Sequence, residues 1–416
     1  MKRLKWLYPG MQVKRWVILF AFGIIMVSVG FVLIITEETS GSKSGGSFII
    51  ILGIIAIITG VKRIIKSFTD IFNKEGEELV DRIYQKRVLE KGPRIVTVGG
   101  GTGLSTLLRG LKEYTSNITA IVTVADDGGS SGRLRKEFDV LPPGDIRNCI
   151  VALADSETLV SKLFQYRFQD GMGLKGHNFG NLFITALSQV TGDFQKAIKE
   201  SSAVLAIRGN VVPSTLSNVV LVAKHKDGSE TVGESQIPKN KSPIQKMSLR
   251  SQKASSDGQI QPTDEAIDAI RHADAIVLGP GSLFTSVMPN LLVSGLYKEI
   301  VRSNVMKIYI CNVMTQPGET DNFAASDHVK AILDHTSPGI LNYCIVNIAP
   351  LPAQMLEKYK LEDSYPVEAD TKVLEQMGCV VRRANLISTS DYLRHDSMKL
   401  AGAVLDIVSA GKREVV

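Results

Sequence analysis

Two long apolar stretches open the chain, and a longer region of alternating apolar runs and amphipathic segments follows them. Residues 16–36 carry no charged side chain, and at ~1.5 Å per residue they are long enough to cross a ~30 Å hydrocarbon core. A second apolar run, residues 48–61, reaches that length when it is extended to about 45–65. We therefore predict a membrane anchor over residues 1–66 with two transmembrane segments, followed by a helical juxtamembrane linker over 67–93.

Basic residues flank both predicted spans on the same side of the membrane. Five Lys and Arg precede the first span and three follow the second, whereas the Gly/Ser-rich loop between them has one lysine and two glutamates. The positive-inside rule then places the N-terminus and the C-terminal domain in the cytoplasm of a multi-pass membrane protein. A cleaved signal peptide is the alternative for the first span, but its apolar region is too long and no small-x-small cleavage site follows.

The charge distribution argues against nucleic acid as a partner. The formal net charge is +6, and the predicted anchor accounts for all of it, so the remainder of the chain is nearly neutral. A basic field that would steer polyanions to the domain is therefore not expected. The four cysteines lie far apart without a CxxC spacing, which predicts neither a zinc cluster nor a disulfide framework.

The region beyond residue 94 alternates short β-branched runs with helical segments. We predict strands over 94–98, 118–124, 274–279, 307–312, 342–347 and 379–383. We predict helices over 102–113, 145–154, 157–169, 179–190, 194–206, 264–272, 287–301, 325–335 and 397–409. This alternation is typical of a mainly parallel, Rossmann-like α/β sheet with helices on both faces, here one domain over 94–416.

Residues 216–235 have a different pattern from the rest of the domain. Two polar-alternating strands surround Asp227 and Gly228, which predicts an added β-hairpin. The polar stretch over 235–262 that follows is expected to be a mobile excursion from the sheet.

A glycine turn follows the first predicted strand of the domain. Strand, turn and helix together place backbone N–H groups and a positive helix end at one point, as a phosphate or diphosphate cradle requires. The turn is not a Walker A loop, because no Gly-Lys-Ser/Thr follows, and Leu104 or Thr106 stands where a dinucleotide fingerprint has its third glycine. An ordinary strand–helix turn is the alternative. The candidate ligands here are Gly99, Gly100, Gly101, Thr102 and Gly103.

Two adjacent carboxylates, Asp126 and Asp127, follow the second predicted strand. They could bind ribose hydroxyls, hold Mg²⁺ through their oxygens, or act as a base. The structural alternative is a helix cap beside a solvated turn residue. Further donors come directly after them in the sequence: Gly128, Gly129, Ser130, Ser131 and Arg133.

Further polar turns lie at predicted strand or helix ends. Ligands of open parallel sheets collect outside the carboxyl ends of the strands, so we expect these turns to contribute to one site. The candidates are Asp145; His177, Asn178 and Asn181; Gly279, Gly281, Ser282 and Thr285; and Asn312 and Thr315. No Ser-His-Asp, Cys-His or His/Cys metal arrangement stands out in the sequence.

Seven motifs, in order, resemble the gluconeogenesis factor family, which is related to the 2-phospho-L-lactate transferases that assemble a deazaflavin coenzyme. The motifs are "GGGTGLSTLLRGLK", "ADDGGSSGRLR", "PPGDIRNC", "GHNFGN", "NVVPST", "GPGSLFTS" and "CNVMTQPGET". The resemblance spans Arg94 to the C-terminus. It implies a cytoplasmic Rossmann-like domain that binds UDP-type nucleotide sugars, with a role in cell shape and wall synthesis during growth on gluconeogenic carbon sources.

The relatives also imply a role for the aspartate pair. In the transferases the corresponding pair lies in the substrate site and the reaction needs Mg²⁺, so by similarity Asp126 and Asp127 are the catalytic and metal-binding candidates. Two features of this chain differ from its relatives, one from the usual soluble family member and one from the transferases. This chain has a membrane anchor, and its Gly-Gly-Ser-Ser follows the gluconeogenesis-factor motif, which makes deazaflavin transfer less favoured.

The sequence leaves three candidate functions. The leading hypothesis is a regulatory protein that binds a UDP-sugar, with the diphosphate on the glycine turn and ribose or sugar hydroxyls on Asp126 or Asp127. The second is a Mg²⁺-dependent transferase, and the third is an NAD(P)-dependent dehydrogenase. The incomplete glycine pattern weakens the third, so no NAD is expected. Wall-synthesis proteins and a second copy of the chain are the expected protein partners.

Overall fold

The computed structural model describes residues 14–36, 40–72, 87–155, 159–252, 259–388 and 394–414. The chain forms two compact units, Met1–Arg87 and Val88–Val416. Most of the predicted juxtamembrane linker, residues 73–86, lies outside the described residues.

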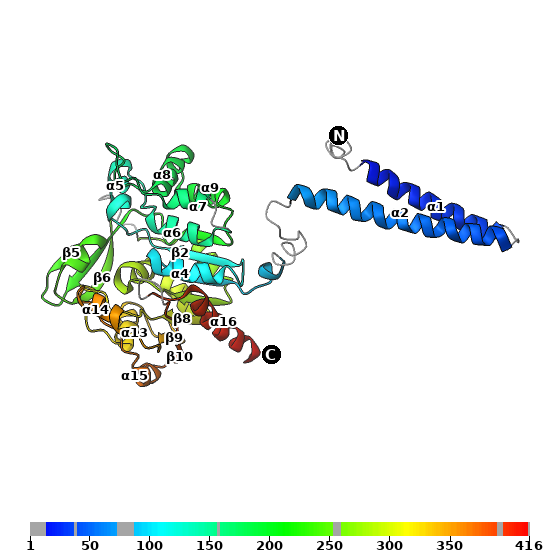
Figure 1. Ribbon diagram of the computed structural model, residues 1–416. Helices are drawn as coiled ribbons and strands as arrows, with labels where there is room; N and C mark the ends of the chain where they lie inside the picture. The colour runs from blue at the N-terminus through cyan, green and yellow to red at the C-terminus, as the bar shows by residue number, and fades with distance from the viewer. Residues whose placement is uncertain are drawn as a thin grey trace. The chain divides into compact units, whose positions relative to one another are not determined.

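The first unit contains a hairpin of two long helices, α1 (Lys14–Thr36) and α2 (Ser40–Phe72) (Figure 1). Both are long and apolar enough to cross a membrane, over Arg15–Thr36 and Lys43–Lys66, and their large aliphatic side chains are mostly exposed. These spans agree with the two segments that the sequence predicts. Arg15 and Arg63 lie at the end of the hairpin where α1 begins and the apolar span of α2 ends. Their guanidinium groups are 5.1 and 5.2 Å from the centroid of the Trp16 ring.

The two helices contact each other through glycines spaced seven residues apart. Gly23 and Gly30 of α1 and Gly46, Gly53 and Gly60 of α2 are all buried. A Cβ atom on Gly53 would lie 2.8 Å from the Gly23 carbonyl oxygen, and one on Gly30 would lie 2.7 Å from the Gly46 carbonyl oxygen. Small residues allow helix backbones to approach this closely, so the hairpin is antiparallel and its interface is backbone against backbone.

The second unit is built on a seven-stranded parallel sheet with the order β10-β9-β8-β7-β1-β2-β3. Its strands are β1 (Ile95–Gly99), β2 (Ile118–Val122), β3 (Asn210–Pro213), β7 (Ala275–Leu278), β8 (Met306–Ile310), β9 (Tyr343–Asn347) and β10 (Val380–Ala384). Every residue of β1 and β7 is buried, as expected for central strands covered on both faces. The predicted Rossmann-like sheet is confirmed.

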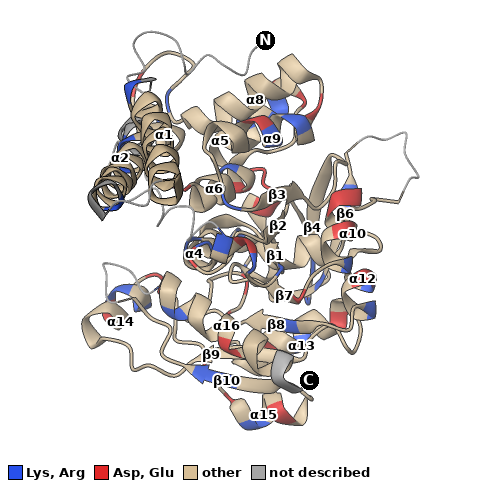
Figure 2. Cartoon of the chain, turned by 90° about the vertical axis from the view of Figure 1, so that its right-hand side faces the viewer, with Lys and Arg blue, Asp and Glu red and all other residues tan. Residues whose placement is uncertain are grey.

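The sheet order reverses between β1 and β7. The chain leaves β1 toward β2 and β3, then returns to the other side of β1 and continues outward from β7 to β10. Helices α4, α6 and α16 lie on one face of the sheet, and α10, α12 and α13 lie on the other (Figure 2). In doubly wound sheets the crevice at such a reversal is where ligands bind.

Among the described residues beyond Arg94, fifteen helical segments surround the two sheets of this unit. They are α4 (Gly101–Leu111), α5 (Gly129–Phe138), α6 (Gly144–Leu153), α7 (Leu159–Gln165), α8 (Phe179–Thr191), α9 (Phe194–Val204), η2 (Glu234–Lys239), α10 (Asp264–Arg271), η3 (Leu283–Val287), α11 (Met288–Leu291), α12 (Leu296–Arg302), α13 (Ala325–His335), α14 (Ala353–Lys360), α15 (Thr371–Gln376) and α16 (Ser397–Glu414).

A three-stranded antiparallel sheet, β5-β4-β6, adjoins the main one. It contains the predicted hairpin as β4 (Val219–His225) and β5 (Glu230–Val232). The expectation of a mobile excursion over 235–262 is wrong for much of the described part. There, η2 precedes β6 (Ile244–Ser251), which pairs with the whole of β4. β6 was missed in the sequence because only one of its faces is buried, so polar residues are interspersed along it.

Candidate functional site

Two glycine turns lie side by side where the sheet order reverses. β1 and β7 pair in parallel, with Val98 opposite Leu278, and each strand ends in one of the turns, residues 99–103 and 279–281. A Cβ atom on Gly103 would lie 2.7 Å from the Pro280 carbonyl oxygen and 2.9 Å from the Gly281 Cα. The second turn can therefore pack directly on the start of α4 only because residue 103 has no side chain.

Both turns line a cavity of about 550 Å³. The turn after β8 completes one wall, so three adjacent strands contribute their carboxyl ends to the same space. The structure brings these sequence-predicted residues together around it: Gly100, Gly101, Thr102, Gly103, Gly281, Ser282, Thr285, Asn312 and Thr315. Gly99 and Gly279 sit just before them, and the Gly99 carbonyl accepts a hydrogen bond from Asn290 Nδ2 at 3.0 Å.

Asp145 lies directly beneath the first turn, at the start of α6. Its carboxylate accepts a hydrogen bond from the Gly101 N–H, and a Cβ atom on Gly100 would overlap that carboxylate. Burial, with the nearby charge of Asp126, raises the pKa of Asp145 to about 7. Part of the donor capacity at the start of α4 is thus already used by the chain itself.

Asp126 and Asp127 border this region but do not line the cavity. Asp126 Oδ1 accepts the Gly128 N–H at 2.9 Å, and burial raises its pKa. Asp127 Oδ1 accepts the Ser235 N–H at 2.8 Å, which fixes the start of η2. Because Ser235 follows Glu234, Asp127 fixes the backbone next to a carboxyl group that does line the cavity.

Glu234 was not among the residues predicted from the sequence. Burial, followed by the charges of Asp126, Asp145, Asp127 and Glu319, raises its pKa to about 8. A carboxyl group in this environment carries a proton at neutral pH and can donate a hydrogen bond. The residue lies in the stretch over 216–235 that was predicted as a β-hairpin, so no sequence signal pointed to it as a site residue.

A second group of predicted residues holds α5 against α8, away from the cavity lining. Ser130 Oγ lies 3.2 Å from His177 Nδ1, and Asn181 Nδ2 donates to Ser131 Oγ at 3.4 Å. Asn178 is the N-cap of α8, with its side chain accepting the Asn181 N–H.

The rest of this group lies near the start of α5. Gly128 is the N-cap residue and Gly129 is the first helical residue. Arg133 donates to the Lys175 carbonyl oxygen at 3.1 Å. The polar groups of this second cluster therefore serve packing between helices in the present arrangement.

Several further residues of the cavity wall were not predicted from the sequence, among them Glu319, Tyr359, Arg394 and His395. Glu319 lies within the quoted "CNVMTQPGET" motif, which was the available signal for it. The others come from distant segments without a recognisable pattern. Burial lowers the pKa of His395 to about 4, and its Nε2 is buried without a hydrogen-bond partner among the described residues.

The carboxylates do not form a complete metal cage. Among the described residues, no group of three or more His, Cys, Asp or Glu is placed to hold a metal ion. Asp126 and Asp127 each already accept a backbone N–H. Mg²⁺ commonly takes only one or two carboxylates and completes its shell with water and substrate phosphates. The residues therefore fit a Mg²⁺ ion that arrives with a phosphate ligand, and they do not fit a resident protein-ligated ion.

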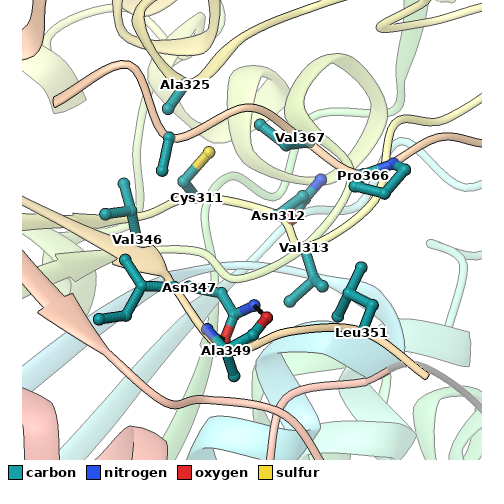
Figure 3. A pocket seen from close by; sticks show the side chains of 12 residues that line it. Cys311, Asn312, Val313, Ala325, Val346, Asn347, Ala349, Leu351, Pro366 and Val367 are labelled. Atoms are coloured by element: carbon teal, nitrogen blue, oxygen red, sulfur yellow. Dashed lines mark hydrogen bonds between the residues drawn. The ribbon is translucent and has the colours of Figure 1, made fainter. Parts of the chain in front are cut away.

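A smaller cavity of about 140 Å³ lies at the carboxyl ends of β8 and β9 (Figure 3). It shares Asn312 and Val313 with the larger one. Asn347 in its wall donates to the Ala349 carbonyl oxygen at 3.2 Å and accepts the Leu386 N–H at 3.0 Å. Cys311 also lines it, and burial raises the pKa of this thiol, so it is no reactive thiolate.

The reversal point and its cavity define a Rossmann-like α/β protein with a small-molecule-sized site at the carboxyl edge of the sheet. Residues 95–387 match the family model described as 2-phospho-L-lactate transferase CofD. The chain is 48% identical to the gluconeogenesis factor of Bacillus subtilis over 317 residues, which covers 76% of this chain and 98% of that protein. The chain belongs to the CofD family, among relatives named gluconeogenesis factors.

Two further relatives define the extent of the likeness. A homologue in Clostridium acetobutylicum that carries the gluconeogenesis factor name is 43% identical over 423 residues, covering 98% of this chain and 92% of that protein. A crystal structure of a UPF0052-family protein from Bacillus halodurans has a TM-score of 0.72 at 47% identity, covering 76% of this chain and 99% of that chain. The alignment with the Clostridium protein therefore extends into the N-terminal unit.

Proposed function

We propose that this chain is a membrane-anchored regulatory protein that binds a UDP-type nucleotide sugar. The observation that carries the proposal is the single 550 Å³ cavity lined by the glycine turns of two adjacent strands. Its size is within the range of small-molecule sites, and the start of α4 offers N–H groups and a positive dipole end. The ligand's diphosphate would lie along residues 100–103, with the guanidinium group of Arg394 as a cation in the same cavity.

The charges of the cavity are compatible with an anionic ligand. Glu234 has a pKa of about 8 and Asp145 a pKa of about 7, so a large share of both groups is neutral at pH 7. A protonated Glu234 would donate to a phosphate or hydroxyl oxygen instead of repelling it. Asp127 would act as a positioning residue, because it holds the Ser235 N–H next to Glu234.

A regulatory role is favoured because the described residues of the cavity wall bring no activated nucleophile to the ligand. Its Ser282 hydroxyl donates to the Glu319 carboxylate and its Thr285 hydroxyl donates to Ser282 Oγ. Burial lowers the pKa of its histidine, His395. Occupancy of the cavity would then report nucleotide-sugar supply to wall-synthesis proteins at the membrane, as the family resemblance implies.

Calorimetry on the full chain in nanodiscs tests the proposal with UDP-N-acetylglucosamine. We expect saturable heat that is lost in Arg394→Ala and kept in Arg133→Ala. Arg133 of α5 is the matched control, because it donates to the Lys175 carbonyl oxygen and does not line the cavity. The absence of heat at millimolar ligand would rule the proposal out.

The second candidate is a Mg²⁺-dependent transferase, favoured by the CofD match and by the carboxylates around the first turn. When bound with a phosphate ligand, Mg²⁺ would neutralise charge on that group. Incubation with nucleotide-activated donors and Mg²⁺ tests this function. Turnover that disappears in Asp127→Asn while nucleotide binding persists would establish it, and binding without turnover would leave the regulatory function.

We also propose that α1 and α2 span the membrane with both hairpin ends in the cytoplasm. The support is the helix length together with the basic residues, which gather at the free ends of the antiparallel pair. Protease added to spheroplasts should leave the domain intact until the membrane is permeabilised. Digestion of the domain in intact spheroplasts would contradict this topology.

A further inference from the structure

The second glycine turn carries a set of hydrogen-bond donors that all converge on one point. Ser282 and Thr285 present hydroxyls there, and the backbone N–H groups of Phe284 and Thr285 point to the same place. The Thr285 hydroxyl donates to Ser282 Oγ at 2.6 Å. Hydroxyl and N–H donors in one concave turn are the chemistry that binds a carboxylate or a phosphate oxygen pair.

The chain fills this donor set itself, with Glu319 from the loop that follows β8. Ser282 Oγ–H donates to Glu319 Oε2, and Thr285 Oγ1 lies 3.3 Å from Glu319 Oε1. The N–H groups of Phe284 and Thr285 also donate to this carboxylate. A carboxylate has about four lone-pair sites, and the Ser282 hydroxyl with the N–H groups of Phe284 and Thr285 already occupies most of them.

The position of Glu319 is decided by tertiary structure and by nothing local. It is 34 residues from Thr285 in sequence and is only 7% exposed, yet it lines the same cavity as the first glycine turn. Burial raises the pKa of Glu319, and the hydrogen bonds from the surrounding donors act in the opposite direction by favouring the ionised form. The ionised form, to which these donors hydrogen-bond, places negative charge beside the second turn, in the cavity that the start of α4 also lines.

We propose that Glu319 is a built-in anion that closes the second turn to ligand phosphate and thereby determines specificity. With Glu319 in place, a ligand anion is accepted only at the first turn. A ligand with a further negative group at the second turn is rejected by like-charge repulsion and by the absence of free donors. The identity of the ligand rests on the proposed function, whereas the occupied donor set does not.

Small-anion rescue tests the donor set without any nucleotide. Glu319→Ala leaves the hydroxyl and N–H donors around a gap, and we expect its Tm in chloride to fall by about 3–6 °C. Acetate supplies the missing carboxylate, so titration with acetate at constant ionic strength should restore most of the loss in a saturable way. Inorganic phosphate should act similarly. If the variant does not fold in chloride, the refolding yield in acetate against chloride becomes the readout.

Glu362→Ala is the matched control, because Glu362 is an exposed carboxylate that lines the same cavity. It should show the same small response to acetate as the unaltered protein. An equal response of Glu319→Ala and Glu362→Ala would overturn the proposal.

A second measurement examines specificity and depends on the proposed function. UDP-glucose and UDP-glucuronate differ by one carboxylate, so the unaltered chain should bind the first about tenfold more tightly. Glu319→Gln should reduce this preference to about twofold, and an unchanged preference would contradict the specificity role. If neither sugar nucleotide binds while acetate rescues Glu319→Ala, the proposed function fails and the built-in anion stands.

Discussion

Glycine has different roles in the two-helix hairpin of α1 and α2 and at the edge of the sheet. In the hairpin, Gly23 and Gly53 face each other on straight helices, and the missing side chains let two backbones meet. At the sheet edge, Gly101 and Gly281 have φ values of +64° and +156°, and Gly103 makes room for a second turn. The first use needs only small volume at a regular spacing, whereas the second needs a particular backbone shape at each position.

The difference shows in what each region can tolerate. The hairpin interface repeats every seven residues, so one enlarged glycine disturbs one of several equivalent contacts. The two turns at the sheet edge meet at one place, where Pro280 and Gly281 pack on Gly103. A single added methyl group there moves both walls of the cavity. We therefore expect the largest effects of substitution at the sheet edge.

The strongest test of this contrast is Gly103→Ala. Its Cβ would lie 2.7 Å from the Pro280 carbonyl oxygen, so the turns must separate, and the free energy of unfolding should fall by about 1–3 kcal/mol. Urea unfolding measures this change, and calorimetry should show loss of ligand heat. Gly402→Ala in α16 is the matched control. It meets nothing within 4 Å, and helix propensity should make it neutral or stabilising by up to ~1 kcal/mol.

Substitution of a glycine in the helix hairpin should have an intermediate effect. Gly53→Ile would place a branched side chain against Val27 and the Gly23 carbonyl, so the helices should move apart toward the ~8–10 Å axial separation of ordinary helix pairs. Spin labels at Ile24 and Ile54 in nanodiscs would report a longer and broader distance distribution. Gly45→Ile, where an added Cβ meets nothing within 4 Å, should leave the distribution unchanged. A shift of equal size in both variants would refute the glycine interface.

The smallest effect is a pH dependence that should belong to the sheet edge alone. The folded-state pKa of Glu234, about 8, lies above its usual 4.5, so the folded chain retains a proton that the unfolded chain releases. Stability should therefore fall as pH rises from about 4.5 to about 8. The glycine contacts of the hairpin involve no titratable group.

Glu234→Gln removes this dependence in part, because Asp145 titrates nearby with a pKa of about 7. Between pH 6 and pH 8 the unaltered chain should lose on the order of 1 kcal/mol more stability than the variant. Urea unfolding at the two pH values checks this, with Glu362→Gln as the exposed-glutamate control. Parallel pH profiles for the unaltered chain and Glu234→Gln would show that Glu234 is not held neutral by the fold.

The sequence predicted most of the central sheet because its strands are short, unbroken and β-branched. β1, β2, β7, β8, β9 and β10 all lie within or beside the predicted ranges. β3 was missed because it has four residues and ends in Pro213. The predicted helix over 287–301 is instead α11 and α12, which are separated by residues 292–295.

The two apolar spans, the glycine turn after β1 and the alternation of strands and helices follow from the sequence alone, since each depends on residues that are neighbours in the chain. The tertiary structure alone decided which polar groups share the cavity. Glu234, Glu319 and Arg394 come from three separate segments, whereas Ser130 and His177, equally polar in sequence, turn toward each other between α5 and α8. Local periodicity specifies strands and helices, but side-chain partners depend on long-range packing that no local pattern encodes.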